Sequence, residues 1–194
     1  MNWFFGVYGL FVCLSANMLG PADAGKSYSV SLVNERVFSP CENHPDNFLY
    51  QAFDMSNLTY EYKEDDTLLV EGDIIYLLDT PPTQIISGTA EVFKKQRGQW
   101  VSTVYSLRRL DLCKSVFNPV EFWYRYTQII PEENRDCPPK KGTLYHISTQ
   151  AETEFKNMDE RNAEGEYKAQ VIVTYGANDD EFVCFNVLFT LTRI

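Results

Sequence analysis

The sequence has few of the residues on which catalytic and metal sites depend. Of its 194 residues only two are histidines, His44 and His146, and neither has a second histidine at metal-ligand spacing. The chain also lacks the H-E-x-x-H, G-x-S-x-G and P-loop motifs, which carry zinc, serine-nucleophile and phosphate chemistry. We therefore expect a protein that is not an enzyme and that uses no cofactor and no metal.

Positive charge is scarce as well. Lysine and arginine number 17 against 27 aspartates and glutamates, which gives a net charge of −10. Binding to a phosphate backbone requires a basic face. Nucleic acid is therefore not an expected partner.

Long apolar runs are absent after the first residues of the chain. Residues 3–14 read WFFGVYGLFVCL and are followed by Ala22-Asp23-Ala24, which is typical of a secretory signal peptide. A membrane anchor is the alternative, but this run is shorter than the roughly twenty residues that span a bilayer. We predict that residues 1–24 are a cleaved signal peptide and that residues 25–194 form a single domain of a secreted, extracellular protein.

Cysteine is also sparse, and Cys13 lies within the apolar run. The other four are Cys41, Cys113, Cys137 and Cys184. In a secreted chain four cysteines indicate two disulfides, and three pairings are open. If these four cysteines form two disulfides, none of them is a free thiol that could act as a nucleophile.

Aromatic residues are abundant, with 13 Phe, 12 Tyr and 3 Trp, and such residues suit strands as well as apolar cavities. Alternation of apolar and polar residues predicts strands at 28–32, 48–62, 67–78, 84–94, 99–107, 143–149, 166–175 and 181–192. The last two strands form a β-hairpin around a turn at residues 176–180. Strands joined by short turns predict a mostly β, antiparallel sandwich or barrel.

One segment departs from the strand pattern. Residues 111–130 read DLCKSVFNPVEFWYRYTQII, and Pro119 suits a first helical turn. We expect short helical turns near residues 112–130, with more aromatic surface than one face can bury. Elsewhere, Asn57-Leu58-Thr59 is an N-x-S/T sequon, which makes Asn57 a candidate glycosylation site.

The C-terminal half carries an ordered set of motifs. Residues 137–143 read CPPKKGT, residues 165–167 read GEY, and Cys184 lies in the last predicted strand. This order resembles the ganglioside activator proteins. It is still more similar to the insect CheB-type chemosensory proteins, within the ML lipid-recognition superfamily. The resemblance spans about residues 35–194.

The resemblance implies a cup-shaped antiparallel β-sandwich with an apolar cavity and no catalysis. It also implies the disulfides Cys41–Cys184 and Cys113–Cys137. The implied function is that of a monomeric carrier for a small hydrophobic ligand, such as a lipid, a fatty acid or a cuticular-hydrocarbon-like cue. In this family the carrier acts in pheromone or taste perception, so a chemosensory receptor or ion channel is an implied partner.

The aromatic segment and the predicted strands supply candidate ligand-binding residues. Expected at the cavity mouth are Phe117, Phe122, Trp123, Tyr126, Ile129 and Ile130. Expected in the cavity lining are Trp100, Val104, Tyr167, Val171, Val173, Phe185 and Phe189. The alternative is that the second set is ordinary core. The chain would then be an extracellular interaction domain that docks on a receptor or a membrane.

Overall fold

The fold is described from a computed structural model, in residues 26–33, 37–63, 67–121, 123–152, 154–158, 163–176 and 181–194. The predicted signal peptide, Phe122 and most of the predicted turn at 176–180 lie outside these residues. No helix in the described part of the chain is long and apolar enough to cross a membrane.

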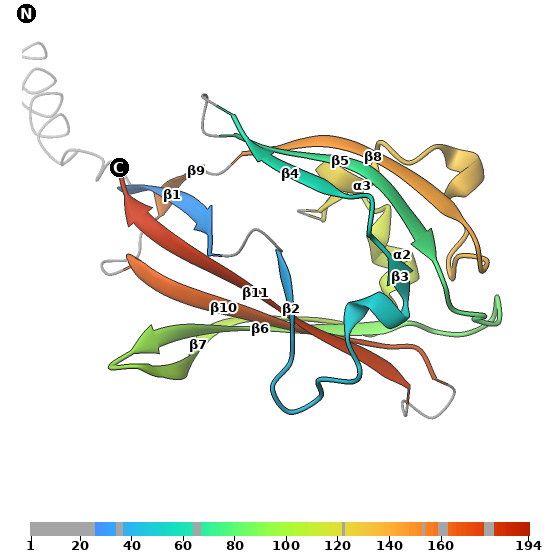
Figure 1. Cartoon of the computed structure of the whole chain (residues 1–194), viewed down its shortest axis with the longest axis horizontal. Coiled ribbons are helices and arrows are strands. Elements are labelled where there is room, and N and C mark those ends of the chain that lie inside the picture. Colours follow the sequence, from blue (N-terminus) through green and yellow to red (C-terminus); the bar gives the residue numbers. More distant parts are fainter. Residues whose placement is uncertain are drawn as a thin grey trace, which may run out of the picture.

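Within the described residues, two antiparallel sheets form the two layers of the fold (Figure 1). The larger sheet has seven strands in the order β7-β6-β10-β11-β1-β9, with β2 paired to β11. Its strands are β1 Lys26–Leu32, β2 Phe38–Pro40, β6 Ser87–Gln96, β7 Gln99–Arg109, β9 Glu154–Met158, β10 Gly165–Thr174 and β11 Phe182–Arg193.

The smaller sheet has four strands, and β5 is central to it because it pairs with each of the other three. These strands are β3 Phe53–Asp54, β4 Thr59–Tyr62, β5 Thr67–Tyr76 and β8 Leu144–Glu152. The predicted mostly β, antiparallel architecture is thereby confirmed.

The C-terminal hairpin has a long pairing with no register shift in the large sheet. β10 and β11 stay in register from Gly165 opposite Leu191 to Thr174 opposite Phe182. Its inward face supplies buried side chains to two core clusters. One cluster contains Tyr28, Ala163, Tyr167 and Leu191. The other contains Leu49, Ala52 and Val183.

The segment predicted as one strand at 48–62 is instead divided into three elements. A 3-10 turn, η1 (Leu49–Gln51), and β3 precede a tight turn in which Leu58 N–H donates to Met55 C=O, and β4 follows. Gly72 of β5 permits this turn, because a Cβ there would lie 2.1 Å from the Asn57 carbonyl oxygen. Asn57 itself is exposed in the turn.

Short helices follow β7, as predicted. They are α2 (Leu112–Val116), α3 (Tyr124–Thr127) and the 3-10 turn η2 (Glu132–Asn134). Asp111 caps α2 by accepting a hydrogen bond from Lys114 N–H. Pro119 lies in the turn between α2 and α3 and not in a first helical turn.

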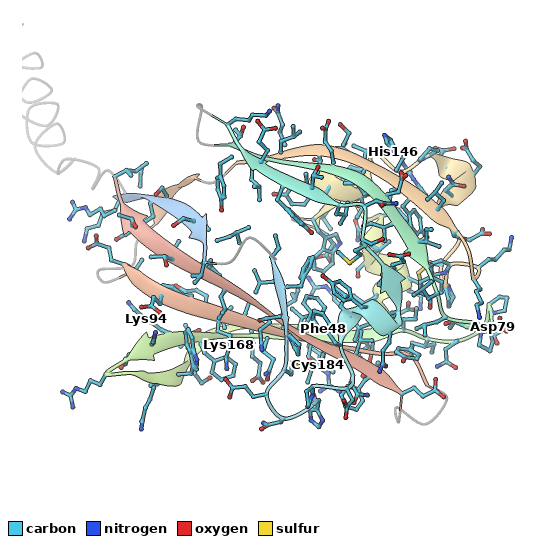
Figure 2. All side chains as sticks on the ribbon, in the orientation of Figure 1. Phe48, Asp79, Lys94, His146, Lys168 and Cys184 are labelled. Carbon is cyan, nitrogen blue, oxygen red and sulfur yellow. A yellow bond between two sulfur atoms is a disulfide. The ribbon has the colours of Figure 1, made fainter. Side chains whose placement is uncertain are left out.

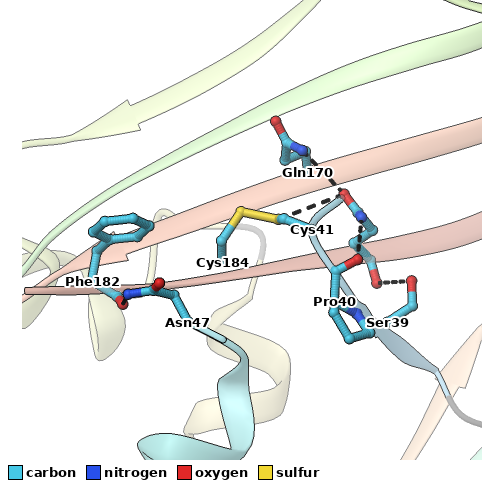
Figure 3. Close-up of a disulfide and its surroundings, with 8 residues drawn as sticks. Ser39, Pro40, Cys41, Asn47, Gln170, Phe182 and Cys184 are labelled. Carbon is cyan, nitrogen blue, oxygen red and sulfur yellow. Dashed lines mark hydrogen bonds between the residues drawn. A yellow bond between two sulfur atoms is a disulfide. The ribbon is translucent and has the colours of Figure 1, made fainter. Parts of the chain in front are cut away.

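Both disulfides join the cysteines that the resemblance implied, Cys41 with Cys184 and Cys113 with Cys137. Around the first of them, Asn47 Nδ2 donates to the Phe182 carbonyl at 3.1 Å (Figure 3). The Cys184 N–H also donates to Asn47 C=O. These contacts hold the 41–47 loop against β11.

Candidate functional site

A cavity of about 390 Å³ is lined by both sheets and by the segment that contains the short helices. Figure 1 shows α2 and α3 on the same side of the molecule as the lower part of β5. Most of the lining side chains are apolar. From the smaller sheet and its flanks come Leu49, Ala52, Phe53, Met55, Ile74, Tyr76, Leu78, Tyr145 and Ile147. The other lining residues are Ile86, Leu112, Val116, Phe117, Thr127, Ile130, Asp136, Cys137, Pro139, Val173, Tyr175 and Val183.

Strand alternation directs the β8 side chains to opposite faces. Tyr145 and Ile147 line the cavity, whereas Leu144 is 50% exposed and the His146 side chain 79% exposed. Figure 2 shows His146 on the outer side of the sheet. The wall at this point therefore follows from a period-two pattern that is readable in the sequence.

The helical wall of the cavity is linked to the segment before β8 by a disulfide, and its two α-helices are joined to each other by hydrogen bonds. The Cys113–Cys137 disulfide links α2 to the segment before β8. Trp123 Nε1 donates to Ser115 C=O at 3.0 Å, and the Thr127 hydroxyl donates to Val116 C=O at 2.7 Å. The wall is thereby held by a covalent link and by side-chain hydrogen bonds to the backbone.

The absence of a side chain at Gly88 brings α2 close to the large sheet. A Cβ at Gly88 of β6 would lie 2.9 Å from Leu112 Cδ1. Leu112 N–H also donates to Ile86 C=O at 2.7 Å. Leu112 can therefore cover the sheet and face the cavity at the same time.

The lining residues with polar side chains are three tyrosines, one aspartate and one threonine. The Tyr76 and Thr80 hydroxyls are 2.6 Å apart, and Lys140 Nζ lies 2.8 Å from Asp136 Oδ2. Burial raises the pKa of Tyr76, and it raises the pKa of Tyr145 to about 12, with Tyr76 and Asp136 adding to the effect. Burial likewise raises the pKa of Tyr175. At neutral pH these tyrosines are uncharged.

The predicted mouth residues divide into two groups. Phe117 and Ile130 line the cavity. Trp123, Tyr126 and Ile129 are not among the lining residues. Trp123 instead packs in the helical segment, where the Arg109 guanidinium lies 5.6 Å from the centre of its ring.

Of the predicted lining residues, Val173 lines the cavity, and the others lie elsewhere. Val104 requires correction, because its side chain is 90% exposed on β7. Trp100 lies beneath the ammonium groups of Lys95 and Lys168, near the β6–β7 end of the sheet. Figure 2 shows Lys168 close to β6 there.

Three further predicted lining residues pack in the core, and Val171 is half-buried outside the cavity lining. The Tyr167 and Phe189 rings stack with 5.4 Å between their centres. Phe185 packs edge-on against Phe38 at 5.3 Å. The hairpin pattern places Val173, Phe185 and Phe189 on one face, but the cavity occupies only the Val173–Val183 end of that face.

The outer face of the smaller sheet carries a histidine–carboxylate pair, with 2.9 Å between His146 Nδ1 and Asp73 Oδ1. Ser148 follows on the same face, but its hydroxyl donates to Glu71 Oε1. The described residues thus provide no serine bonded to this histidine. Nor do they bring together three or more His, Cys, Asp or Glu side chains that could hold a metal ion.

No protein family matches the chain, and none of the curated proteins matches it. Among solved structures it is similar to the crystal structure of chicken MD-1 complexed with lipid IVa. The two chains are 14% identical, the match covers 86% of this chain and 96% of the other, and the TM-score is 0.32. A likeness this distant carries no function, whereas the cavity is a feature of the chain itself.

Proposed function

We propose that the protein is a non-enzymatic carrier that binds a small hydrophobic molecule in the cavity between its sheets. The observation that carries this proposal is a cavity of about 390 Å³ with a predominantly apolar lining. Small-molecule sites typically measure about 300–1,000 Å³ and are mostly apolar. An apolar chain that moves from water into such a site gains about 0.8 kcal/mol per methylene.

The finer role that we propose is secreted transport of a lipid, fatty acid or hydrocarbon-like cue in pheromone or taste perception. The order of motifs shared with CheB-type proteins supports this role. The two disulfides support an oxidising, extracellular location. In this proposal the carrier is a monomer that delivers its ligand to a chemosensory receptor or ion channel. It carries a glycan on Asn57, which is exposed.

The arrangement of polar side chains supports binding without chemistry. Ser148 is bonded to Glu71 and not to His146. The histidine also lies on the outer face of β8, on the opposite side from Tyr145 and Ile147. We therefore expect His146→Ala and His44→Ala to leave ligand binding within a few fold of wild type. Turnover of an ester or glycolipid that either substitution abolished, without unfolding the chain, would contradict the carrier role.

An interaction domain that docks on a receptor or membrane is the second candidate. Exposed apolar side chains favour it, notably Leu110 at 70% and Val120 at 86% exposure. This candidate requires an interior filled by core side chains. The cavity makes it the weaker explanation.

Native mass spectrometry of the purified protein tests the carrier role directly. We expect hydrophobic cargo that dissociates on activation and is recovered by organic extraction. Ile147→Trp should fill the cavity and abolish uptake of a fluorescent fatty-acid analogue. Leu144→Trp is the matched control, because it adds the same volume on the outer face of the same strand. Equal uptake by both variants, with no extractable cargo, would refute the proposal.

A further inference from the structure

The cavity reaches solvent at one part of its wall and is closed at another. Asp136 lines the part that reaches solvent, and its side chain is 57% exposed. The closed part is lined by Leu49, Ala52 and Val183, which are only 7%, 2% and 1% exposed. A molecule with a polar end and an apolar chain therefore keeps its polar end in water when the tip of the chain lies against these three buried residues.

Three phenylalanines lie behind the closed part of the wall. Phe38, Phe48 and Phe185 pack against the cluster formed by the three buried lining residues, but they do not line the cavity themselves. Figure 2 shows Phe48 near β11. On that strand Phe185 is the next residue after Val183 on the same face, and its ring meets the Phe38 ring edge-on at 5.3 Å. The phenylalanines thus form a second layer behind the lining.

Beyond Phe185 the inward face of β11 belongs to a filled part of the core. Phe189 lies further along this face, and its ring stacks on the Tyr167 ring with 5.4 Å between their centres. Both belong to the cluster around Tyr28 and Leu191, and the described residues of that cluster do not line the cavity. Along the strand, Phe185 therefore lies between the cavity and this second cluster.

We propose that Phe185, backed by Phe38, is the stop that sets the length of the apolar chain that the cavity accepts. This inference rests on the carrier function and narrows its ligand class to a single straight chain of limited length. The cavity volume of about 390 Å³ lies near the lower end of the range for small-molecule sites, so it suits one chain better than several. A methylene beyond the limit cannot enter without displacing a packed ring. It remains at the part of the wall that reaches solvent and adds no affinity.

Binding across a series of chain lengths tests the stop. The straight-chain fatty acids from octanoic to hexadecanoic acid compete in turn with N-phenyl-1-naphthylamine, whose own affinity is measured for each variant. For the wild-type protein we expect affinity to rise roughly fourfold with each added methylene and then to level off. In Phe185→Ala the rise should continue for about three more methylenes, because the surrounding core only partly refills the space that the ring leaves.

Phe189→Ala is the matched control. It makes the same substitution on the same face of the same strand, but Phe189 packs in the cluster that does not line the cavity. We expect both alanine variants to be less stable than wild type and only Phe185→Ala to shift the length limit. Where an alanine variant does not fold, Phe185→Leu and Phe189→Leu make the same comparison with a smaller loss of volume.

The outcomes separate the stop from the carrier function. The same length limit in wild type and in the Phe185 variants would overturn the stop and leave the carrier role intact. Affinity that kept rising over the whole series would overturn it in the same way, as would an equal shift of the limit in the Phe189 variants. Failure of the probe and of every acid to bind to the folded wild-type protein would overturn both.

Discussion

Arg109 and Glu121 form a two-point salt bridge, in which Nε donates to Oε1 at 2.9 Å and Nη2 to Oε2 at 2.8 Å. Arg109 is the last residue of β7, and Glu121 lies between α2 and α3. The bridge therefore ties the helical wall of the cavity to the edge of the large sheet. Its two parallel bonds define the orientation of both groups.

Loss of this bridge should loosen the cavity wall. Glu121→Gln keeps the shape of the side chain and removes its charge, so we expect weaker ligand binding and a lower thermal midpoint. Lys114→Gln is the control, because its partner Asp111 lies on the same segment and the lysine side chain is 85% exposed. Equal effects of the two substitutions on binding would show that the bridge does not position the wall.

The same bridge predicts a pH dependence with a defined sign. Hydrogen bonds from Arg109 lower the pKa of Glu121 in the folded protein. The resulting stabilisation is present above the ordinary glutamate pKa, about 4.3, and is lost as the pH falls through the lowered value. The difference in thermal midpoint between wild type and Glu121→Gln should therefore shrink at acid pH. A difference that stayed constant down to about pH 2 would exclude a charged bridge.

The two disulfides should differ in what they contribute to binding. Cys41–Cys184 spans 143 residues and Cys113–Cys137 spans 24. In the chain-entropy model their removal by paired Ser substitutions costs about 5 and about 3 kcal/mol. Only Cys113–Cys137 reaches the cavity, through Cys137. We expect its removal alone to reduce ligand affinity per folded molecule, measured by probe titration corrected for the folded fraction. Equal loss in both variants would contradict this division.

Gly72 and Gly98 provide a matched test of how β4 is placed. Both have positive φ, but a Cβ at Gly72 would meet the Asn57 backbone, whereas nothing lies within 4 Å of one at Gly98. Gly98→Ala should cost only backbone strain, about 1–3 kcal/mol. Gly72→Ala adds a backbone clash and should lower the thermal midpoint further. Equal thermal midpoints of the two variants would show that the turn at residues 55–58 can shift to accommodate the added Cβ without a loss of stability.

The sequence predicted the strands better than it predicted the site. Alternation located β5, β8 and the C-terminal hairpin because each keeps one face inward over many residues. β2 has three residues and contains Pro40, so it offers too short a pattern to detect. Whether an inward side chain lines the cavity depends on whether another part of the chain packs against it. Val173 and Phe185 follow the same alternation, yet only Val173 is in the cavity lining, and the Phe38 ring packs edge-on against Phe185.

Ionisation of Tyr145 should lower the stability of the fold at alkaline pH, because the pKa of this residue is raised in the folded protein. Burial raises this pKa to about 12, above the value of about 10 in an unfolded chain. The unfolded state therefore releases its proton first, and the stabilisation that is complete below about pH 10 is lost as the pH rises toward 12. Over this pH range, the free energy of unfolding should fall less in the Tyr145→Phe variant than in the wild-type protein, as measured by urea unfolding.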